Sequence, residues 1–90
     1  MNFDTPTPIP GLIWRTMDQE TVLIQPQTGH YVIINEVGSY IWQQMSQAYS
    51  VKEIERLLVE TYGITIEQAA ADLHTFLMEL QKKGLIRDEN

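Results

Sequence analysis

The chain has 90 residues, 43% of them hydrophobic, and a formal net charge of −6 at neutral pH. This length predicts one domain with a modest core, and the hydrophobic fraction is that of a globular protein. The sequence has no cysteine, which excludes disulfide bonds, thiolate metal sites and a cysteine nucleophile. It also has no signal-peptide pattern and no run of the ~20 apolar residues that span a membrane, so we expect a cytoplasmic protein.

Residues 1–11 contain Pro6, Pro8 and Pro10. Proline fixes φ and removes a backbone donor, so this segment is predicted to be an extended N-terminal arm. The arm either hangs loose or packs over the domain. We expect the folded domain to cover residues 12–86, followed by a tail over residues 87–90.

Three strands are predicted over residues 12–17, 21–25 and 30–34, where β-branched residues are frequent. Pro26 presets φ for a turn between the second and third strands, and Gly29 can adopt a positive φ there. Short turns between neighbouring strands predict an antiparallel meander.

The third predicted strand carries four consecutive apolar residues, Tyr31, Val32, Ile33 and Ile34. A strand with one face in water should alternate apolar and polar side chains, so both faces of this strand need cover. An apolar edge strand often takes on a foreign strand through backbone hydrogen bonds, with pockets for alternate side chains. The alternative is that a helix of the same domain covers the strand, and the sequence leaves both open.

A helical period begins after Asn35. In the first helix Gly38 either admits a neighbouring backbone or is a tolerated small residue. The apolar stripe of this helix is predicted to consist of Val37, Tyr40, Ile41, Gln44 or Met45, and Ala48, with Trp42 beside it.

Two capping boxes, Ser50 with Glu53 and Thr65 with Gln68, predict the starts of the second and third helices. Glycines suited to the left-handed conformation end these helices, at Gly63 and Gly84. The third helix, ending near Lys83, has the apolar stripe Ile66, Ala69, Ala70, Leu73, Phe76, Leu77 and Leu80. Strands followed by helices predict an α+β domain, and a three-stranded antiparallel sheet with three helices resembles a winged helix-turn-helix.

No catalytic or metal-binding pattern is present. His30 and His74 have no partner at metal-ligand spacing, and the sequence has no glycine-rich phosphate loop. The carboxylates are spread along helix surfaces, without the proximity that acid–base catalysis requires. We therefore expect a protein that is not an enzyme and has no cofactor and no metal.

DNA binding is disfavoured by the charges of the third helix. This helix has no Lys or Arg between residues 66 and 81 but contains Glu67, Asp72 and Glu79. A recognition helix needs several phosphate contacts, and two lysines at its end cannot supply them. Two possibilities remain, a peptide-binding module and an adaptor whose apolar strand is buried against a fixed protein partner.

Residues 28–42, with the sequence TGHYVIINEVGSYIW, resemble the centre of the PqqD-like family. Ile34-Asn35 stands where the family usually has Leu-Asn. Residues 50–54 are similar to the start of the family's second helix, and residues 72–86 are similar to its C-terminal part. The resemblance covers roughly residues 12–86, and the specificity comes from the ordered set of motifs.

This resemblance implies a recognition element that binds the leader of a ribosomally made precursor peptide. The leader would add to the third strand, in a groove beside the third helix. The implied peptide-binding residues are His30, Tyr31, Val32, Ile33 and Ile34 in the strand and Asp72, Phe76, Glu79 and Lys83 on the helix. Phe76 could equally belong to the core and the three charged residues to the solvated surface. Which pair of strand side chains faces the helices stays open.

The hairpin at residues 25–29, QPQTG, departs from the acidic hairpin of family members in pyrroloquinoline quinone synthesis. It is more similar to the stand-alone elements of lasso-peptide pathways. That similarity implies three partners: the precursor's leader, a separate leader peptidase and a cyclase. The alternatives are a chaperone of another modified-peptide or pyrroloquinoline quinone pathway and a winged-helix DNA-binding protein.

Overall fold

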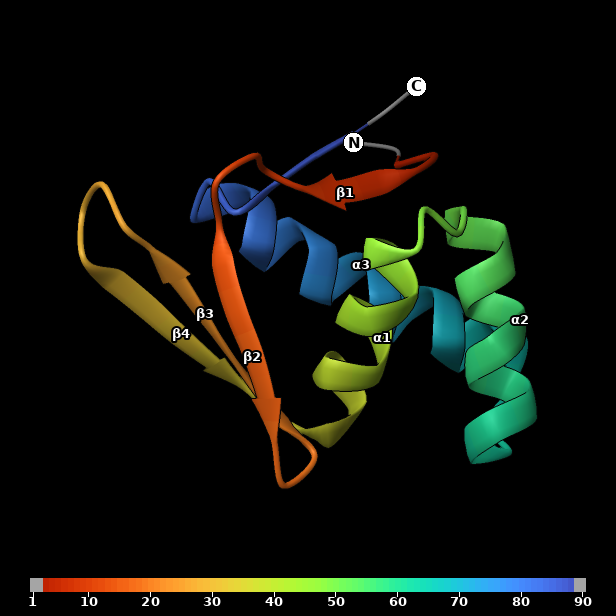
Figure 1. Cartoon of the computed structure of the whole chain (residues 1–90). Coiled ribbons are helices and arrows are strands. Elements are labelled where there is room, and N and C mark those ends of the chain that lie inside the picture. Colours follow the sequence, from red (N-terminus) through yellow and green to blue (C-terminus); the bar gives the residue numbers. More distant parts are fainter. Residues whose placement is uncertain (1–2, 89–90) are drawn as a thin grey trace.

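The computed structural model describes residues 3–88, and its central feature is a three-stranded antiparallel sheet (Figure 1). The strands are β2 (Ile13–Met17), β3 (Glu20–Gln25) and β4 (His30–Ile34), in the order β2-β3-β4. The predicted meander and the α+β class are confirmed, with strand ends that differ from prediction by one residue at most. Gly29 adopts a φ of 76° in the second turn, as the turn chemistry predicted.

The proline-rich segment packs onto the domain. Strand β1 (Pro6–Pro8) pairs antiparallel with β5 (Ile86–Asp88), and the two form a separate small sheet (Figure 1). Proline is tolerated here because β1 is an edge strand with a single neighbour. Residues 87 and 88 belong to β5 and not to the predicted C-terminal tail. Residues 1–2 of the predicted arm and 89–90 of the predicted tail lie outside the described residues.

Three helices follow the meander: α1 (Glu36–Ser46), α2 (Val51–Tyr62) and α3 (Ile66–Lys82). Figure 1 shows the meander on one side of the molecule and α2 on the other, with α1 and α3 between them. Ser50 and Glu53 form the predicted capping box, and Gly63 ends α2 in the left-handed conformation.

The second predicted capping box is only half formed. The Thr65 hydroxyl accepts a hydrogen bond from the backbone N–H of Gln68 at 3.1 Å, as expected for a helix N-cap. The Gln68 side chain, however, donates to the carboxylate of Asp72 at 2.8 Å, one turn further along the helix. An anionic acceptor on the same face competes for the amide that would otherwise reach back to Thr65.

The core stripe of α1 differs from the predicted one. Trp42, expected beside the stripe, is fully buried together with Ile41 and Met45, whereas Val37 and Ala48 are exposed. The burial is shifted by about one residue because Gly38 and Ser39 face the sheet and α3 in the first turn. Trp42 then packs edge-to-face against Trp14 of β2, with ring centroids 6.0 Å apart.

Candidate functional site

Strand β4 is an edge strand. It pairs with β3 along one side, from His30 opposite Gln25 to Ile34 opposite Thr21. No strand within residues 3–88 pairs with its other side. An edge strand directs alternate N–H and C=O groups away from its neighbour, and these groups can template a further strand.

The side chains of β4 alternate between the two faces of the sheet. Val32 is partly buried and packs against the core, and Ile34 is 7% exposed. Tyr31 and Ile33 are 67% and 58% exposed on the opposite face. The pair that faces the helices is therefore Val32 and Ile34, which settles the question that the sequence left open.

A cavity of about 270 Å³ lies between the start of β4 and the C-terminal end of α3. Its lining residues are Gln25, His30, Tyr31, Val32, Lys83 and Leu85. Three of the implied strand residues thus lie beside one implied helix residue, Lys83. Gln25 and Leu85 were not singled out from the sequence, because only the folded hairpin and the turn after α3 place them there.

Phe76 marks the other end of β4. A Cβ atom built on Gly38 would lie 2.9 Å from Cε1 of Phe76 and 3.4 Å from Cβ of Ile34. The side chains of Phe76 and Ile34 therefore both lie next to Gly38. Phe76 is partly buried and packs against the core. Helix α3 therefore runs along β4, with Phe76 near the strand's end and Lys83 near its start.

The charged members of the implied site are exposed on the same flank of α3. Asp72, Glu79 and Lys83 follow the helical spacing of Phe76. The structure brings Lys83 to the cavity beside β4, whereas the Asp72 carboxylate bonds to Gln68 within the helix. Glu79 is exposed and lines a neighbouring cavity of about 510 Å³ together with Met78 and Lys82, not the cavity beside β4.

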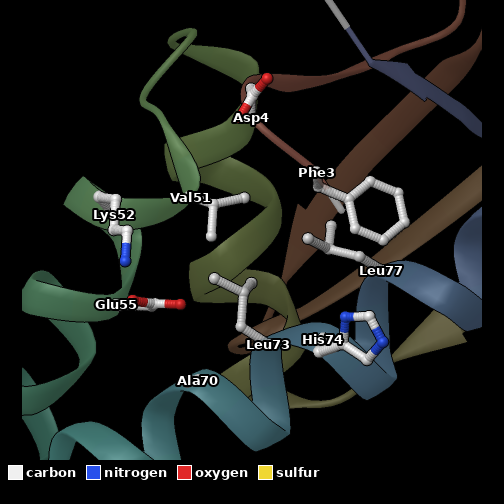
Figure 2. A pocket seen from close by; sticks show the side chains of 9 residues that line it. All are labelled: Phe3, Asp4, Val51, Lys52, Glu55, Ala70, Leu73, His74 and Leu77. Carbon is white, nitrogen blue, oxygen red and sulfur yellow. The ribbon is translucent and has the colours of Figure 1, made fainter. Parts of the chain in front are cut away.

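The opposite flank of α3 lines a different cavity, of about 470 Å³ (Figure 2). Figure 2 shows Phe3 of the arm above His74, and their ring centroids are 6.1 Å apart. His74 and Phe76 are two residues apart, about 200° around the helix, so this cavity is separate from the β4 side. The sequence did not predict it because it requires the arm to pack over α2 and α3.

Within residues 3–88, no group of three or more His, Cys, Asp or Glu side chains could hold a metal ion. In that part of the chain, no helix is long and apolar enough to cross a membrane.

Comparisons with known proteins agree with this architecture. A family model described as Coenzyme PQQ synthesis protein D (PqqD) matches residues 20–86. A solved structure described as "TbiB1 in Complex with the TbiA(beta) Leader Peptide" has a TM-score of 0.87 and 27% sequence identity, over 93% of this chain and 98% of that chain. Another, "Lasso peptide synthetase B1 complexed with the leader peptide", has a TM-score of 0.85 over 92% of this chain and 98% of that chain, and its 19% identity supports the fold alone. A search of curated proteins found no match.

Proposed function

The chain belongs to the PqqD family, and from that premise we propose that it binds the leader of a ribosomally made precursor peptide in lasso-peptide biosynthesis. The observation that carries the proposal is the edge strand β4 with its side-chain-sized cavity next to α3. The solved structure at 27% identity is described as bound to a leader peptide. A non-catalytic, cytoplasmic recognition element is the role that we assign to this chain.

In the proposed complex the leader adds to β4 as a fourth strand. Backbone groups of residues 30–34 form the hydrogen bonds, and Val32 borders the leader's inward side chains. Phe76 of α3 walls the groove at one end and Lys83, which caps α3, walls it at the other. Asp72 lies along the rim, and Glu79 lies at the border between the groove and the neighbouring cavity of α3. The cavity of about 270 Å³ is smaller than the roughly 300–1,000 Å³ of small-molecule sites, which favours a single peptide side chain.

The expected affinity follows from the contacts that such a strand makes. Four or five ladder hydrogen bonds at about 1 kcal/mol each, with two apolar anchors at about 2–3 kcal/mol each, give roughly 8–11 kcal/mol. Association costs at least about 4 kcal/mol, and ordering the leader costs more. At most about 7 kcal/mol then remains, which corresponds to a dissociation constant of about 10 µM at best, and nanomolar affinity would require additional anchors.

Delivery to enzymes needs a second surface. Ile13, Ile24 and Tyr31 stand opposite one another in the strand register and are exposed on the outer face of the sheet. Exposed apolar patches of this kind often mark protein interfaces. We assign this face to the separate leader peptidase, because an added leader strand would extend the face at its β4 edge. The cyclase would act on the same precursor.

The test is fluorescence anisotropy of a labelled leader peptide, taken from the precursor encoded in the same gene cluster, titrated with the purified chain. Lys83→Ala and Lys82→Ala form a matched pair. They remove the same charge from adjacent residues, but only Lys83 lines the cavity beside β4, whereas Lys82 lines a different surface of α3.

We expect saturable binding that unlabelled leader displaces, weakened at least threefold by Lys83→Ala and unchanged by Lys82→Ala. Equal losses in both variants would indicate non-specific charge attraction instead of the proposed groove. Absence of saturable binding at high micromolar concentration would refute the function, and binding of a labelled DNA duplex in a parallel titration would favour the winged-helix alternative.

A further inference from the structure

The backbone conformation of Gly38 does not require a glycine at this position. Gly38 lies in the first turn of α1, and its φ is outside the positive range that favours glycine. Glycine lowers helix stability relative to alanine at such a position. The described glycines with positive φ are Gly11, Gly29, Gly63 and Gly84, all in turns or at helix ends. The reason for a glycine at residue 38 must therefore be space.

The space that Gly38 leaves is taken by Phe76. An added Cβ would lie 2.9 Å from Cε1 of the Phe76 ring, closer than any ordinary carbon contact. The same Cβ would lie 3.3 Å from the carboxamide oxygen of Asn35, which is fixed by its hydrogen bond to the backbone N–H of Gly38. The aromatic ring is therefore the group that would have to move.

The Phe76 ring cannot move toward the core. Leu73, Leu77 and Leu80 of the same helix are fully or almost fully buried, and a close-packed core does not yield to a displaced ring. Phe76 itself is only partly buried. It lies on the same side of the helix as Lys83, which lines the cavity beside β4, so we infer that its exposed side is this flank of α3. A side chain at residue 38 would push the ring toward the strand edge to which the leader is proposed to add.

We propose that Gly38 is a positioning residue that sets the size of the peptide side chain accepted at the Ile34 end of the groove. The missing Cβ lets the Phe76 ring withdraw against α1, and this leaves room for a bulky apolar leader side chain next to Ile34. The inference rests on the proposed function. It adds a specificity determinant that does not itself contact the peptide.

The test compares Gly38→Ala, Phe76→Leu and the double variant, with Ser50→Ala as a control. Ser50 caps α2 at a distance from β4, so its substitution lowers stability without altering the groove. Leader affinity is measured by anisotropy and stability by urea unfolding. Because the chain has only two phenylalanines, ring ¹³C resonances report directly on the position of Phe76.

We expect Gly38→Ala to weaken leader binding about tenfold and to shift the Phe76 ring resonances, whereas Ser50→Ala leaves both unchanged. Leucine lacks the Cε1 atom, so the double variant should bind no more weakly than Phe76→Leu alone. A leader with its bulkiest inward side chain cut to alanine should lose less affinity for Gly38→Ala than for the unmodified chain.

Two outcomes overturn the proposal while the proposed function stands. One is wild-type affinity in Gly38→Ala, and the other is an equal loss from Gly38→Ala in the presence and absence of Phe76→Leu. If Gly38→Ala alone does not fold, the leader affinity of the double variant is compared with that of Phe76→Leu. A weaker affinity of the double variant would contradict the role of Phe76. A wild-type chain that binds no leader would refute the function itself, and the inference with it.

Discussion

Tyr31 and Val32 are neighbours in β4, and their side chains lie on opposite faces of the sheet, Tyr31 in solvent and Val32 against the core. This alternation gives the strand an inner and an outer face, and its unpaired backbone edge is a third surface. The inner face holds the domain together, the outer face is an apolar surface open to a protein partner, and the edge is open to a peptide. A run of four apolar residues, which looked uniform in the sequence, thus serves the fold and two proposed interactions.

Lysine substitutions at two adjacent positions separate the inner face from the outer face. Ile33→Lys should change the free energy of unfolding by no more than about 0.5 kcal/mol, because the side chain is exposed. Val32→Lys places an ammonium group at a partly buried position against the core and should cost about 2 kcal/mol or more. Urea unfolding measures both effects, and equal stabilities would contradict the assignment of faces.

The same two variants test the groove. Val32→Lys should weaken leader binding at least tenfold, because Val32 lines the cavity at the strand edge. Ile33→Lys should leave leader affinity within about threefold but reduce binding of the leader-loaded chain to the pathway's peptidase, measured by co-elution in size-exclusion chromatography. If Ile33→Lys binds the leader poorly and the peptidase normally, the roles assigned to the two faces are reversed.

A buried hydroxyl chain joins the sheet to α1. The fully buried Thr21 hydroxyl is bonded to the hydroxyl of Thr16 at 2.9 Å and to that of Ser39. Thr21→Val removes the central member while keeping its shape, and should cost about 1–2 kcal/mol of unfolding free energy. Ser39→Ala should cost less, because Thr21 keeps its bond to Thr16.

A double-mutant cycle provides the control for this chain. Removing both hydroxyl groups leaves neither partner unsatisfied, so Thr21→Val with Ser39→Ala should cost less than the sum of the single variants. Strict additivity in urea unfolding would show that the two hydroxyl groups do not interact energetically.

Local patterns in the sequence predicted most of the elements. The caps at Ser50 and Thr65 and the stop at Gly63 all depend on side chains and backbone within a few residues, and all three occur in the structure. The buried face of α1 differs from the predicted apolar stripe because Trp42 packs between α1 and β2. Helical spacing alone does not predict this packing. The pairing of β1 with β5 joins segments about 80 residues apart, and no local pattern indicates such a partner.

The candidate site was predicted only in outline. The apolar strand at residues 30–34 indicated the edge, but its outer and inner faces depend on the register with β3. Lys83 was expected near the groove and lies at a cavity, whereas the roles of Asp72 and Glu79 at the groove remain predictions. The contact of Gly38 with Phe76 crosses two helices, so the sequence offered only a glycine in an unexpected place.

The arm is tied to the domain through a carboxylate. The side chain of Asp88 accepts hydrogen bonds from the backbone N–H groups of Asp4 at 3.1 Å and Thr5 at 2.9 Å. Asp88→Ala should lower the unfolding free energy by about 1–2 kcal/mol, as expected for hydrogen bonds to a charged acceptor near the surface. Amide hydrogen exchange at Thr5 and Thr7 should accelerate, while leader affinity stays within about twofold because β4 lies elsewhere in the fold. Unchanged exchange at Thr5 would contradict this role.

The cap of α2 predicts a specific dependence of stability on pH. The Glu53 carboxylate accepts a hydrogen bond from the backbone N–H of Ser50 at 2.9 Å. That bond, followed by the bond to the Ser50 side chain and the nearby charge of Arg56, lowers the pKa of Glu53 below its usual 4.5. A folded-state pKa below the unfolded value means that the carboxylate stabilises the fold above about pH 4.5, and that this contribution disappears as the pH falls through the folded-state pKa.

Glu53→Gln should therefore be less stable than wild type in urea at pH 6, and the difference should shrink toward pH 3. The difference at pH 6 should also be smaller when Ser50→Ala is already present, because the capping box is then broken. A gap between wild type and Glu53→Gln that stays constant from pH 6 to pH 3 would mean that the charge of Glu53 does not act through the cap.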